Sequence, residues 1–303
     1  MSLHIKYRPS TLEDLKGNNE IKETLSLMLK DKDCPHAFLL HGPTGCGKTT
    51  IGRIIATELE CQDTDFREIN SADLRGIDTI RELRKQMQYR PLQGDVIVWL
   101  IDEAHKLTND AQNALLKMLE DTPKHVYFIL ATTDPNKLIP TVKGRCSQFQ
   151  VNLLSDMQML RLLKTIVKQE NKTLEREVYN QIIQDALGHP RNALTVLEQV
   201  LYIEPEKRLL LAKIVAEEQS KSIELCRVLI KKTGWKEVAL ILSGLKGQDA
   251  ESIRRAVLGY MQSILLKGTN DNAFAVLSEF EEPFYNSGFP GLVASCYRIV
   301  NNL

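Results

Sequence analysis

The sequence lacks several features that would assign it to a special class of protein. None of its apolar runs approaches the length of a membrane-spanning helix. It has no excess of charge of either sign, because 39 Lys and Arg residues balance 39 Asp and Glu residues. A neutral total neither supports nor excludes a nucleic-acid partner, which only a local basic surface would indicate. With 303 residues and 43% hydrophobic content, the chain is long and apolar enough for two or three globular domains.

Cysteine is scarce and scattered. No two of the six cysteines are close enough to form a CxxC pair, which argues against a zinc ribbon. Residues 1–6 contain no apolar core of a signal peptide. Both observations favour a reducing cytoplasm. The cysteines are Cys34, Cys46, Cys61, Cys146, Cys226 and Cys296.

A strand, a glycine-rich loop and a helix follow one another over residues 37–56. Residues 37–40 form a short apolar run typical of a buried strand, and residues 42–49 (GPTGCGKT) match GxxxxGK[ST] at every fixed position. Glycines let the backbone turn several N–H groups towards phosphate oxygens, and the helix that follows adds the positive end of its dipole. Lys48 is expected to reach the β- and γ-phosphates, and Thr49 to ligate Mg²⁺. The residues expected to bind the nucleotide are Gly42, Pro43, Thr44, Gly45, Cys46, Gly47, Lys48, Thr49 and Thr50.

Acidic residues follow a second buried strand. Residues 96–101 are almost continuously apolar, as in parallel strands that are covered on both faces, and they lead into Asp102 and Glu103. In a phosphate-loop ATPase, an acid at this strand end lies beside the loop and holds Mg²⁺. The next carboxylate can orient or deprotonate the attacking water. We predict these roles for Asp102 and Glu103, with solvated acids at a strand end as the alternative.

Further strands complete a predicted sheet. Residues 66–70, 126–131 and 148–151 have strand patterns, and helical patterns lie between them. This alternation over residues 1–152 predicts a parallel, doubly wound α/β sheet with ligands at the carboxyl ends of its strands. Thr133 follows one of these ends, where its hydroxyl could contact the γ-phosphate or simply begin a turn.

Strand patterns stop after residue 152. Ser155 is placed to cap a helix, and Pro190 suits the first turn of another, with Arg191 beside it. A cation at a helix start is unfavourable unless it faces an anion, so Arg191 is a candidate anion ligand. Residues 204–206 are the best linker candidate. We predict a nucleotide-binding core at 1–152, a three-helix unit at 153–204 and, at 205–303, an all-helical domain of four or five helices.

The most basic stretch of the chain precedes residue 91. Its predicted helix carries apolar residues, Met87 among them, on one face and five cations on the other. These cations could follow a nucleic-acid backbone, although a solvated charged face is as good an interpretation. They are Arg75, Arg81, Arg84, Lys85 and Arg90.

These motifs together resemble the AAA+ ATPase subunits of sliding-clamp loaders. Members of this family are the small subunits of replication factor C and the gamma/tau subunit of bacterial DNA polymerase III. Residues 6–9 (KYRP) resemble the family's adenine-side motif, residues 70–77 (NSADLRGI) a stretch of replication factor C, and residues 130–138 (LATTDPNKL) the gamma subunit. Residues 144–146 read Gly-Arg-Cys where the family has Ser-Arg-Cys. The resemblance covers about residues 5–203.

The resemblance implies a role for each matching residue. Tyr7 and Arg8 would lie on the adenine side of ATP. Thr133 takes the sensor-1 place and Arg191 the sensor-2 place, both in contact with the γ-phosphate. Arg145 would reach into the ATP site of a neighbouring subunit, and Gln112 would couple neighbouring subunits. The residues then expected to act in catalysis are Lys48, Glu103, Thr133, Arg191 and, in trans, Arg145.

The same resemblance implies an ATP- and Mg²⁺-dependent loader subunit that opens a sliding clamp and places it on primer-template DNA. Residues 153–204 would be the lid, and residues 205–303 the collar of a homo- or hetero-oligomeric ring, expected to be pentameric. The clamp is expected to meet Met87 and Tyr89. The compartment would be the bacterial cytoplasm or a phage-infected cell, with no membrane partner. The residues expected to contact DNA are Arg75, Arg81, Arg84, Lys85 and Lys117.

Three alternatives stay open at this point. Residues 102–105 (DEAH) also occur in a class of helicases, but those have a second motor domain, for which the sequence shows no pattern. A branch-migration or other DNA-remodelling AAA+ motor would add a winged-helix domain, which the uniformly helical residues 207–303 do not indicate. A scaffold that binds ATP without hydrolysing it is disfavoured by the presence of both Glu103 and Arg145.

If the basic stretch and Lys117 follow the duplex backbone, DNA binding will be independent of sequence and steeply dependent on salt. About four neutralised phosphates would reduce the affinity roughly a hundredfold between about 50 and 200 mM salt. Fluorescence anisotropy of labelled primed DNA measures this slope. An affinity that stays flat over this range would show that the assignment of these cations to DNA is wrong.

Overall fold

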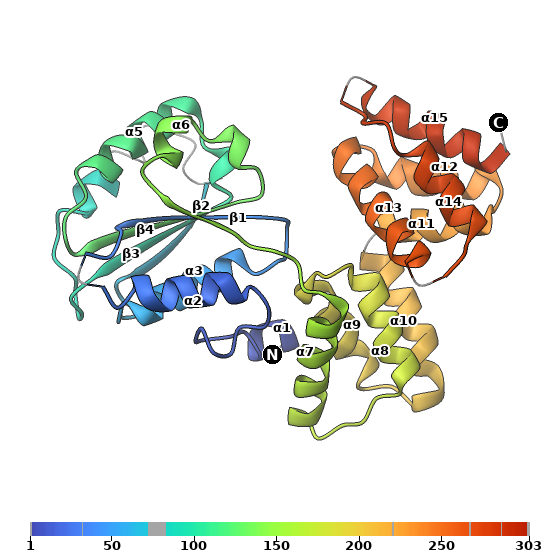
Figure 1. Ribbon diagram of the computed structural model, residues 1–303, viewed down its shortest axis with the longest axis horizontal. Coiled ribbons are helices and arrows are strands. Elements are labelled where there is room, and N and C mark those ends of the chain that lie inside the picture. The colour runs from blue at the N-terminus through green and yellow to red at the C-terminus, as the bar shows by residue number, and fades with distance from the viewer. Residues whose placement is uncertain are drawn as a thin grey trace. The chain divides into compact units, whose positions relative to one another are not determined.

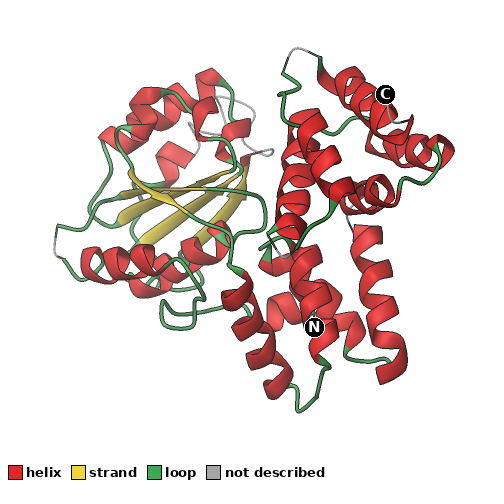
Figure 2. Ribbon diagram, turned by 45° about the vertical axis from the view of Figure 1, so that its right-hand side comes forward, coloured by secondary structure: helices red, strands yellow, loops and turns green. Residues whose placement is uncertain are grey.

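The computed structural model describes residues 2–31, 33–71, 83–219, 221–266, 268–285 and 287–301. The chain divides into two compact units. Unit 1 contains Leu3–Met159 together with His189–Arg191, and unit 2 contains Ser2, Leu160–Gly188 and the residues from Asn192 onwards. A sheet with helices on its faces forms unit 1, whereas the described residues of unit 2 form helices and loops (Figures 1 and 2).

Unit 1 is built on a parallel sheet of five strands in the order β2-β3-β4-β1-β5. This confirms the predicted doubly wound α/β sheet, and each strand lies within one residue of its expected ends. The strands are β1 (Ala37–His41), β2 (Phe66–Asn70), β3 (Ile97–Asp102), β4 (Val126–Thr132) and β5 (Ser147–Gln150).

Helices cover both faces of the sheet (Figure 1). The helices α2 (Asn19–Met28) and α3 (Lys48–Glu58) lie on one face, and α5 (Asn109–Glu120) and α6 (Pro140–Lys143) lie on the other. Shorter elements of unit 1 are α1 (Leu3–Lys6), η2 (Ala104–Lys106) and η3 (Pro135–Lys137).

The alternation of side chains along β1 explains why its sequence is apolar throughout. Phe38 and Leu40 are buried with residues of α2 and α3, whereas Leu39 is buried with residues of α5. Successive side chains of a strand point to opposite faces, so a sheet covered on both faces needs apolar residues at every position. The core of unit 1 therefore has two layers, one on each side of the sheet.

Asparagine is a favoured N-cap residue, but Asn18, which precedes α2, does not cap the helix with its side chain. Asn18 has a φ of 50° and makes no capping bond to the helix. Its side-chain amide instead donates to the carbonyl oxygen of Asn152 at 3.2 Å and accepts the N–H of Asn152 at 2.8 Å. Asn18 therefore joins the start of α2 to the segment after β5, and a long-range contact replaces the local cap that the sequence indicates.

The predicted cap of α7 is confirmed. Ser155 Oγ accepts the backbone N–H of Gln158 at 3.3 Å, and the Gln158 side chain accepts the N–H of Ser155 at 2.9 Å, which is a reciprocal capping box. The helices from this point on are α7 (Asp156–Gln169), α8 (Arg176–Ala186), α9 (Pro190–Val200), α10 (Pro205–Gln219), α11 (Lys221–Lys231), α12 (Trp235–Leu245), α13 (Ala250–Leu265), α14 (Asp271–Glu279) and α15 (Gly288–Asn301).

Residues 204–206 do not form the expected linker, because Pro205 begins α10. In the first turn of that helix, the Arg208 guanidinium donates to the carbonyl oxygen of Thr173 at 2.9 Å and pairs with Glu175 at 3.1 Å. Proline suits the first turn of a helix as well as a linker, so the residue type alone did not decide between them. The division into a lid and a collar at residue 204 stays a prediction.

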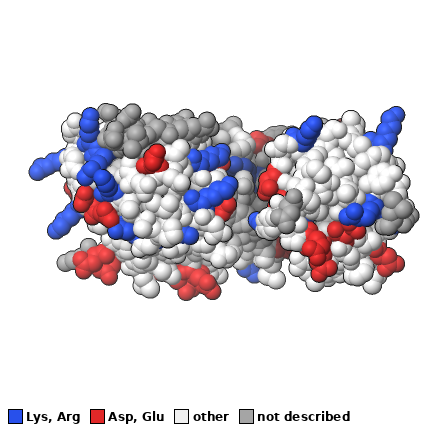
Figure 3. Space-filling view, turned by 90° about the horizontal axis from the view of Figure 1, so that it is seen from above, with Lys and Arg blue, Asp and Glu red and all other residues white. Residues whose placement is uncertain are grey.

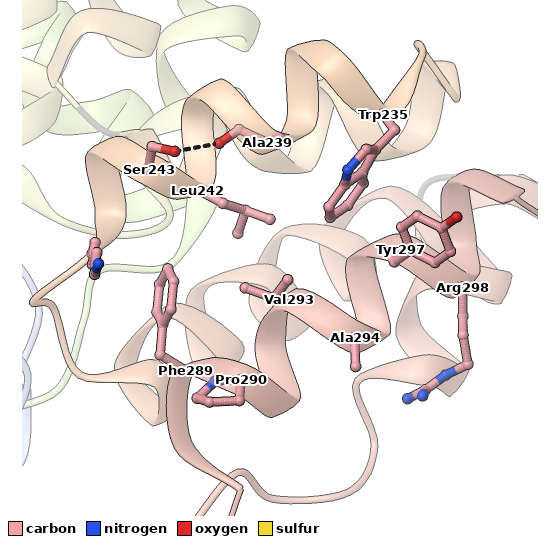
Figure 4. Close-up of a pocket in the computed structure, with 11 residues that line it drawn as sticks. Trp235, Ala239, Leu242, Ser243, Phe289, Pro290, Val293, Ala294, Tyr297 and Arg298 are labelled. Atoms are coloured by element: carbon pink, nitrogen blue, oxygen red, sulfur yellow. Dashed lines mark hydrogen bonds between the residues drawn. The ribbon is translucent and has the colours of Figure 1, made fainter.

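Unit 2 also contains an apolar pocket of about 700 Å³ between α12 and α15 (Figure 4). Trp235 and Tyr297 meet edge to face in its lining, with ring centroids 4.9 Å apart. No acid, histidine or cysteine is among the described residues that line this pocket. Within the described residues, no helix has both the length and the apolar character needed to cross a bilayer.

Asp65 fixes a long loop in unit 1. Its fully buried carboxylate accepts the backbone N–H groups of Leu92 at 2.7 Å, Gln93 at 3.0 Å and Gly94 at 3.4 Å. Burial alone would raise the pKa of this carboxyl, but the three N–H groups and Arg67 outweigh burial and lower the pKa. The loop before β3 is therefore held in place by the buried carboxylate of Asp65.

Replacing Asp65 by Ala removes the acceptor of these three N–H groups. We expect the free energy of unfolding of unit 1 to fall by about 3 kcal/mol, and by less for Asp65→Asn, which keeps one acceptor oxygen. The chain has two tryptophans, Trp99 in unit 1 and Trp235 in unit 2. Urea unfolding in a Trp235→Phe background therefore reports on unit 1 through Trp99 fluorescence.

The pH dependence of this effect has a definite sign. Because the folded-state pKa of Asp65 is lowered, its stabilising contribution is present above the ordinary value of 3.8 and is lost as the pH falls through the folded-state pKa. The difference between wild type and Asp65→Ala should therefore shrink in acid. An unchanged urea midpoint at neutral pH would contradict the proposed role of Asp65.

Candidate nucleotide-binding site

The glycine-rich loop lies between β1 and α3, as predicted, and its shape requires glycine. Gly42 has a φ of 154°, and a Cβ atom there would come within 2.2 Å of the carbonyl oxygen of Val151. Gly45 has a φ of 72°, which side-chain-bearing residues rarely adopt. The helix α3 begins at Lys48, directly after the loop, so its free N–H groups and dipole act at the same place. This cradle fits a bound phosphate chain.

Lys48 is the buried cation of this loop. Its side chain is only 7% exposed, and its ammonium group donates to the carbonyl oxygens of Gly42 at 2.8 Å and Pro43 at 2.7 Å. Burial lowers the pKa of Lys48, and Cys46 and Asp102 act in the opposite direction. The loop carbonyls hold the ammonium where it can reach a bound phosphate.

Thr49 and Asp102 meet beside the loop. The Thr49 hydroxyl donates to Asp102 Oδ2 at 2.8 Å, and Asp102 Oδ1 accepts the N–H of Glu103 at 2.8 Å. Ser71 Oγ donates to the main-chain oxygen of Asp102 at 2.6 Å, which fixes this end of β3. A hydroxyl and a carboxylate are oxygen ligands of the type that Mg²⁺ prefers. The donor set therefore fits Mg²⁺.

Glu103 has an unusual backbone conformation. Its φ of 52° and ψ of 38° are left-handed, which costs a residue other than glycine on the order of 1–3 kcal/mol. This turn leads directly from β3 into η2, and the Glu103 carboxylate pairs with Lys106 at 2.5 Å. Such strain is found most often at functional sites. The sequence did not indicate Lys106 as a partner.

Two hydroxyls lie at the end of β4. Thr132 is fully buried, and its hydroxyl is 3.2 Å from His105 Nδ1 and accepts the N–H of Asp134 at 3.1 Å. Burial is the largest cause of the lowered pKa of His105, whereas Glu103 acts to raise it. Thr133, the predicted sensor, is the next residue and is exposed. Its contact with a γ-phosphate stays a prediction.

Residues His189–Arg191 lie against the phosphate loop within unit 1. His189 Nδ1 is 2.6 Å from the carbonyl oxygen of Thr44. A Cβ atom built on Gly45 would lie 3.7 Å from His189 Nδ1 and 3.9 Å from Arg191 Cβ. The structure thus brings Arg191, predicted from the sequence alone, to the loop that precedes α3.

Further cations gather on the same side of unit 1. The pKa of Arg8 is lowered by burial and by Arg53 and Arg191, with Glu68 acting in the opposite direction. Arg53 of α3 pairs with Glu68 of β2. Tyr7 is half-buried, with the Lys6 ammonium 5.2 Å from its ring centroid. Arg53 had not been predicted as part of this cluster, because its place on a helix gave no sign of its neighbours.

Gln112 is a buried amide on α5 with three hydrogen bonds. Its Nε2 atom donates to the carbonyl oxygens of Leu107 at 3.2 Å and Lys137 at 3.1 Å, and its Oε1 atom accepts the N–H of Ile139 at 2.8 Å. These bonds join the segment before α5 to the segment after β4. Coupling between subunits through Gln112 stays a prediction.

Arg145 lies on the turn between α6 and β5, on the layer of α5 and α6. It is exposed, pairs with Glu120 at the end of α5, and donates to the carbonyl oxygen of Thr141 at 3.1 Å. The departure at Gly144 leaves α6 intact, because Gly144 follows its last residue with an ordinary φ of −67°. The sequence gave no sign of Glu120 as the partner of Arg145.

The predicted DNA and clamp residues lie on the surface or outside the described residues. Arg75 and Arg81 lie outside the described residues. Met87 is fully buried in the core of unit 1, so the expectation that it contacts a clamp was wrong: its place on the apolar face of its helix decides its burial. Tyr89 is 67% exposed.

Of the remaining predicted cations, Arg84 pairs with Asp121 at 3.2 Å, and Lys85 and Lys117 are exposed. On the face that carries α5 and α6, Lys and Arg side chains lie among acidic and uncharged ones (Figure 3). A role for these cations in DNA binding stays a prediction.

Comparison with known proteins agrees with this geometry. A family model described as DNA polymerase III, delta subunit, matches residues 64–155. The DNA polymerase III subunit gamma of Buchnera aphidicola subsp. Schizaphis graminum is 32% identical, and the alignment covers 97% of this chain and 90% of that protein. The chain belongs to the gamma/tau family of DNA polymerase III subunits.

Other relatives are longer than this gamma/tau-family chain. The gamma/tau subunit of Mycobacterium tuberculosis is 36% identical over 66% of this chain but only 39% of its own length. The tau subunit of Escherichia coli is 30% identical over 86% of this chain and 44% of its own length. The chain therefore spans about two fifths of the length of these relatives.

Solved structures confirm the fold. The Thermotoga maritima RuvB Holliday junction branch migration motor superimposes with a TM-score of 0.62 over 78% of this chain and 85% of that chain, at 20% identity. At this level of identity the likeness concerns the fold alone, which is that of an α/β AAA+ domain followed by helices.

The geometry at Glu103 yields a test. If Glu103 is the general base, as predicted from the sequence, Glu103→Gln should reduce ATP turnover by roughly 10²–10⁴-fold, while the affinity for ATP changes by less than about threefold. Glu58→Gln is a matched control, since Glu58 is an exposed acid at the end of α3 that lies away from the phosphate loop. Equal turnover of Glu103→Gln and Glu58→Gln would show that Glu103 is not the base.

Proposed function

We propose that the chain is an ATPase subunit of a bacterial sliding-clamp loader, which uses ATP to open a clamp and place it on primer-template DNA. The observation that supports this most strongly is the meeting of Lys48, the Thr49–Asp102 pair and Arg191 at one loop. Asp102 and Arg191 are far from Lys48 and Thr49 in sequence, and together these four residues supply the charge and ligands that a nucleoside triphosphate needs. The gamma/tau family gives this chemistry its context in DNA replication and favours the bacterial cytoplasm.

Binding of the triphosphate follows from the cations around the loop. The ammonium of Lys48 exchanges its loop carbonyls for the β- and γ-phosphate oxygens, and Arg191 approaches the γ-phosphate. Arg8 and Arg53 add positive charge nearby, and Tyr7 is placed on the side of the base. Burial is the largest cause of the lowered pKa of Arg8, and repulsion by Arg53 and Arg191 lowers it further, so a bound polyanion is favoured beside these arginines.

Hydrolysis assigns one task to each acid. Thr49 and Asp102 would hold Mg²⁺, which neutralises charge on the β- and γ-phosphates when it is bound. Glu103 orients and deprotonates the attacking water, after its carboxylate leaves Lys106. Thr133, at the end of β4, contacts the γ-phosphate or this water. The strained turn at Glu103 keeps the carboxylate at the carboxyl edge of the sheet.

Arg145 acts on a neighbouring subunit in this proposal. Its exposed position beside α6 and its single acidic partner, Glu120, leave it available at a surface. Residues 205–303 would form the collar of a pentameric ring, and Gln112 would transmit changes at the nucleotide to the adjoining subunit. An isolated chain would then hydrolyse ATP slowly, because each site lacks its second arginine.

DNA and the clamp would meet other surfaces of unit 1. Lys85 and Lys117 are exposed cations suited to phosphate contacts, and Arg84 would exchange Asp121 for a phosphate. Arg75 and Arg81 are proposed from the sequence alone. Tyr89 is exposed, as is Leu92 (74%), whose N–H donates to Asp65, and these two apolar side chains are the proposed clamp contact.

A branch-migration motor is the second candidate, because solved RuvB structures share the fold. The sequence relationship favours the clamp loader, at 32% identity over nearly the whole chain against 20% for RuvB. The two differ in what stimulates ATP turnover. A loader responds to primed DNA with a clamp, and a branch-migration motor to a four-way junction.

The trans role of Arg145 is tested by ATP turnover per chain across protein concentration, with primed DNA and a bacterial clamp. We expect the rate per chain to rise with concentration. Arg145→Ala should lose about 10³-fold or more of the stimulated rate, with nucleotide affinity within about threefold. Lys143→Ala, which removes a nearby cation of α6, is the control and should stay within about threefold of wild type.

Mixing two inactive variants separates trans from cis action. In a mixed ring, a subunit with Arg145→Ala keeps its own Glu103 and can receive Arg145 from a neighbour with Glu103→Gln. We therefore expect the mixture to recover a measurable part of the wild-type rate. A mixture as inactive as either variant alone would contradict the trans assignment, and indifference of the wild type to primed DNA and clamp would contradict the loader.

A further inference from the structure

We propose that His189 is a positioning residue, which holds Arg191 against the phosphate loop so that its guanidinium meets the γ-phosphate of ATP. This inference rests on the proposed function, since it concerns how the same site distinguishes ATP from ADP. It goes beyond that function, because it assigns a role to a side chain that contacts the loop backbone rather than the nucleotide.

The hydrogen bond of His189 fixes the state of its ring. The partner of Nδ1, 2.6 Å away, is the backbone carbonyl oxygen of Thr44, which can only accept a hydrogen bond. Nδ1 must therefore carry the hydrogen and donate it. The pKa of this imidazole is lowered, mainly by burial and also by the positive charge of Lys48, although the hydrogen bond to Thr44 acts to raise it. The ring therefore acts as a neutral donor, and Nε2 carries no hydrogen.

The backbone between His189 and Arg191 allows little independent movement. Pro190 is the first residue of α9, where its ring restricts φ to a helical value. His189 and Arg191 approach the same glycine of the loop, with Nδ1 and Cβ at 3.7 and 3.9 Å from the Cβ position of Gly45. A bond from His189 to Thr44 thus places the backbone of Arg191 two residues further on.

If the backbone of Arg191 were mobile, its long side chain would sample many positions. Thr44 belongs to the loop expected to bind the phosphates. The bond from His189 to Thr44 therefore fixes the distance between the backbone of Arg191 and the phosphate site. An effect transmitted through Arg191 should concern the γ-phosphate, which ADP lacks. A direct contribution of His189 to the loop or to the other phosphates would affect ATP and ADP alike.

The test compares the affinities of the full chain for Mg·ATPγS and Mg·ADP, measured by displacement of a fluorescent nucleotide. We expect His189→Ala to weaken ATPγS about tenfold and ADP less than threefold. His189→Asn should stay within threefold of wild type for both, because its amide can donate to the Thr44 carbonyl. Arg191→Ala should lose ATPγS affinity to a similar extent, and adding His189→Ala to it should cause no further loss.

His125→Ala is the matched control, because His125 Nε2 also bonds to a backbone carbonyl, that of Tyr89 at 2.9 Å, on another loop. It should leave both affinities unchanged. Circular dichroism checks that each variant is folded. An equal loss of ATPγS and ADP in His189→Ala, an additional loss in the Arg191→Ala background, or no change at all would overturn the positioning role.

Failure of the proposed function looks different in the same experiment. The nucleotide site itself would be contradicted if the wild-type chain bound neither nucleotide. It would also be contradicted if Lys48→Ala bound both nucleotides as tightly as the wild type does. A wild-type chain that binds both and depends on Lys48, with His189→Ala behaving like wild type, would contradict the role of His189 alone.

Discussion

Parallel pairing of apolar strands is the constraint on which the site depends. In the pairing of β1 with β4, His41 lies opposite Thr132, and in that of β2 with β3, Asn70 lies opposite Asp102. These registers bring the carboxyl ends of the strands to one edge, where the glycine loop, the acids and the β4 threonines follow. A slip of one residue would turn every strand side chain to the opposite face. The register of the strands therefore determines the chemistry at this edge as well as the packing of the core.

Much of this arrangement was predictable, because it follows from patterns local to each segment. The spacing of glycines, Lys48 and Thr49 indicates the loop, and an acid after an apolar run indicates the metal ligand. The features that were missed depend on contacts between distant segments. Asn18 bonds to Asn152 instead of capping α2, and Pro205 begins a helix where a linker was expected. Nothing local distinguishes these outcomes, because the residue types suit either one.

The cations around the loop show how stability and function compete. Lys48 is buried, and Arg53 and Arg191 lie close enough to Arg8 to lower its pKa further than burial alone does. Like charges at short range destabilise the folded chain, and Glu68 of β2, which pairs with Arg53 and also attracts Arg8, offsets part of this repulsion. A bound polyanion removes this repulsion, so ligand binding and folding of unit 1 are linked thermodynamically.

The pair of Arg145 and Glu120 has a consequence for assembly. In the trans role proposed for Arg145, two acceptors would compete for its guanidinium: the carboxylate on its own chain and the phosphates of a neighbour. An exposed ion pair is worth at most about 1 kcal/mol, so loss of the pair with Glu120 would present only a small barrier, and the arginine would have an anionic partner both before and after the exchange. Subunit contact at this point would then be an equilibrium between two acceptors, which a nucleotide with more negative charge would shift further towards the neighbour.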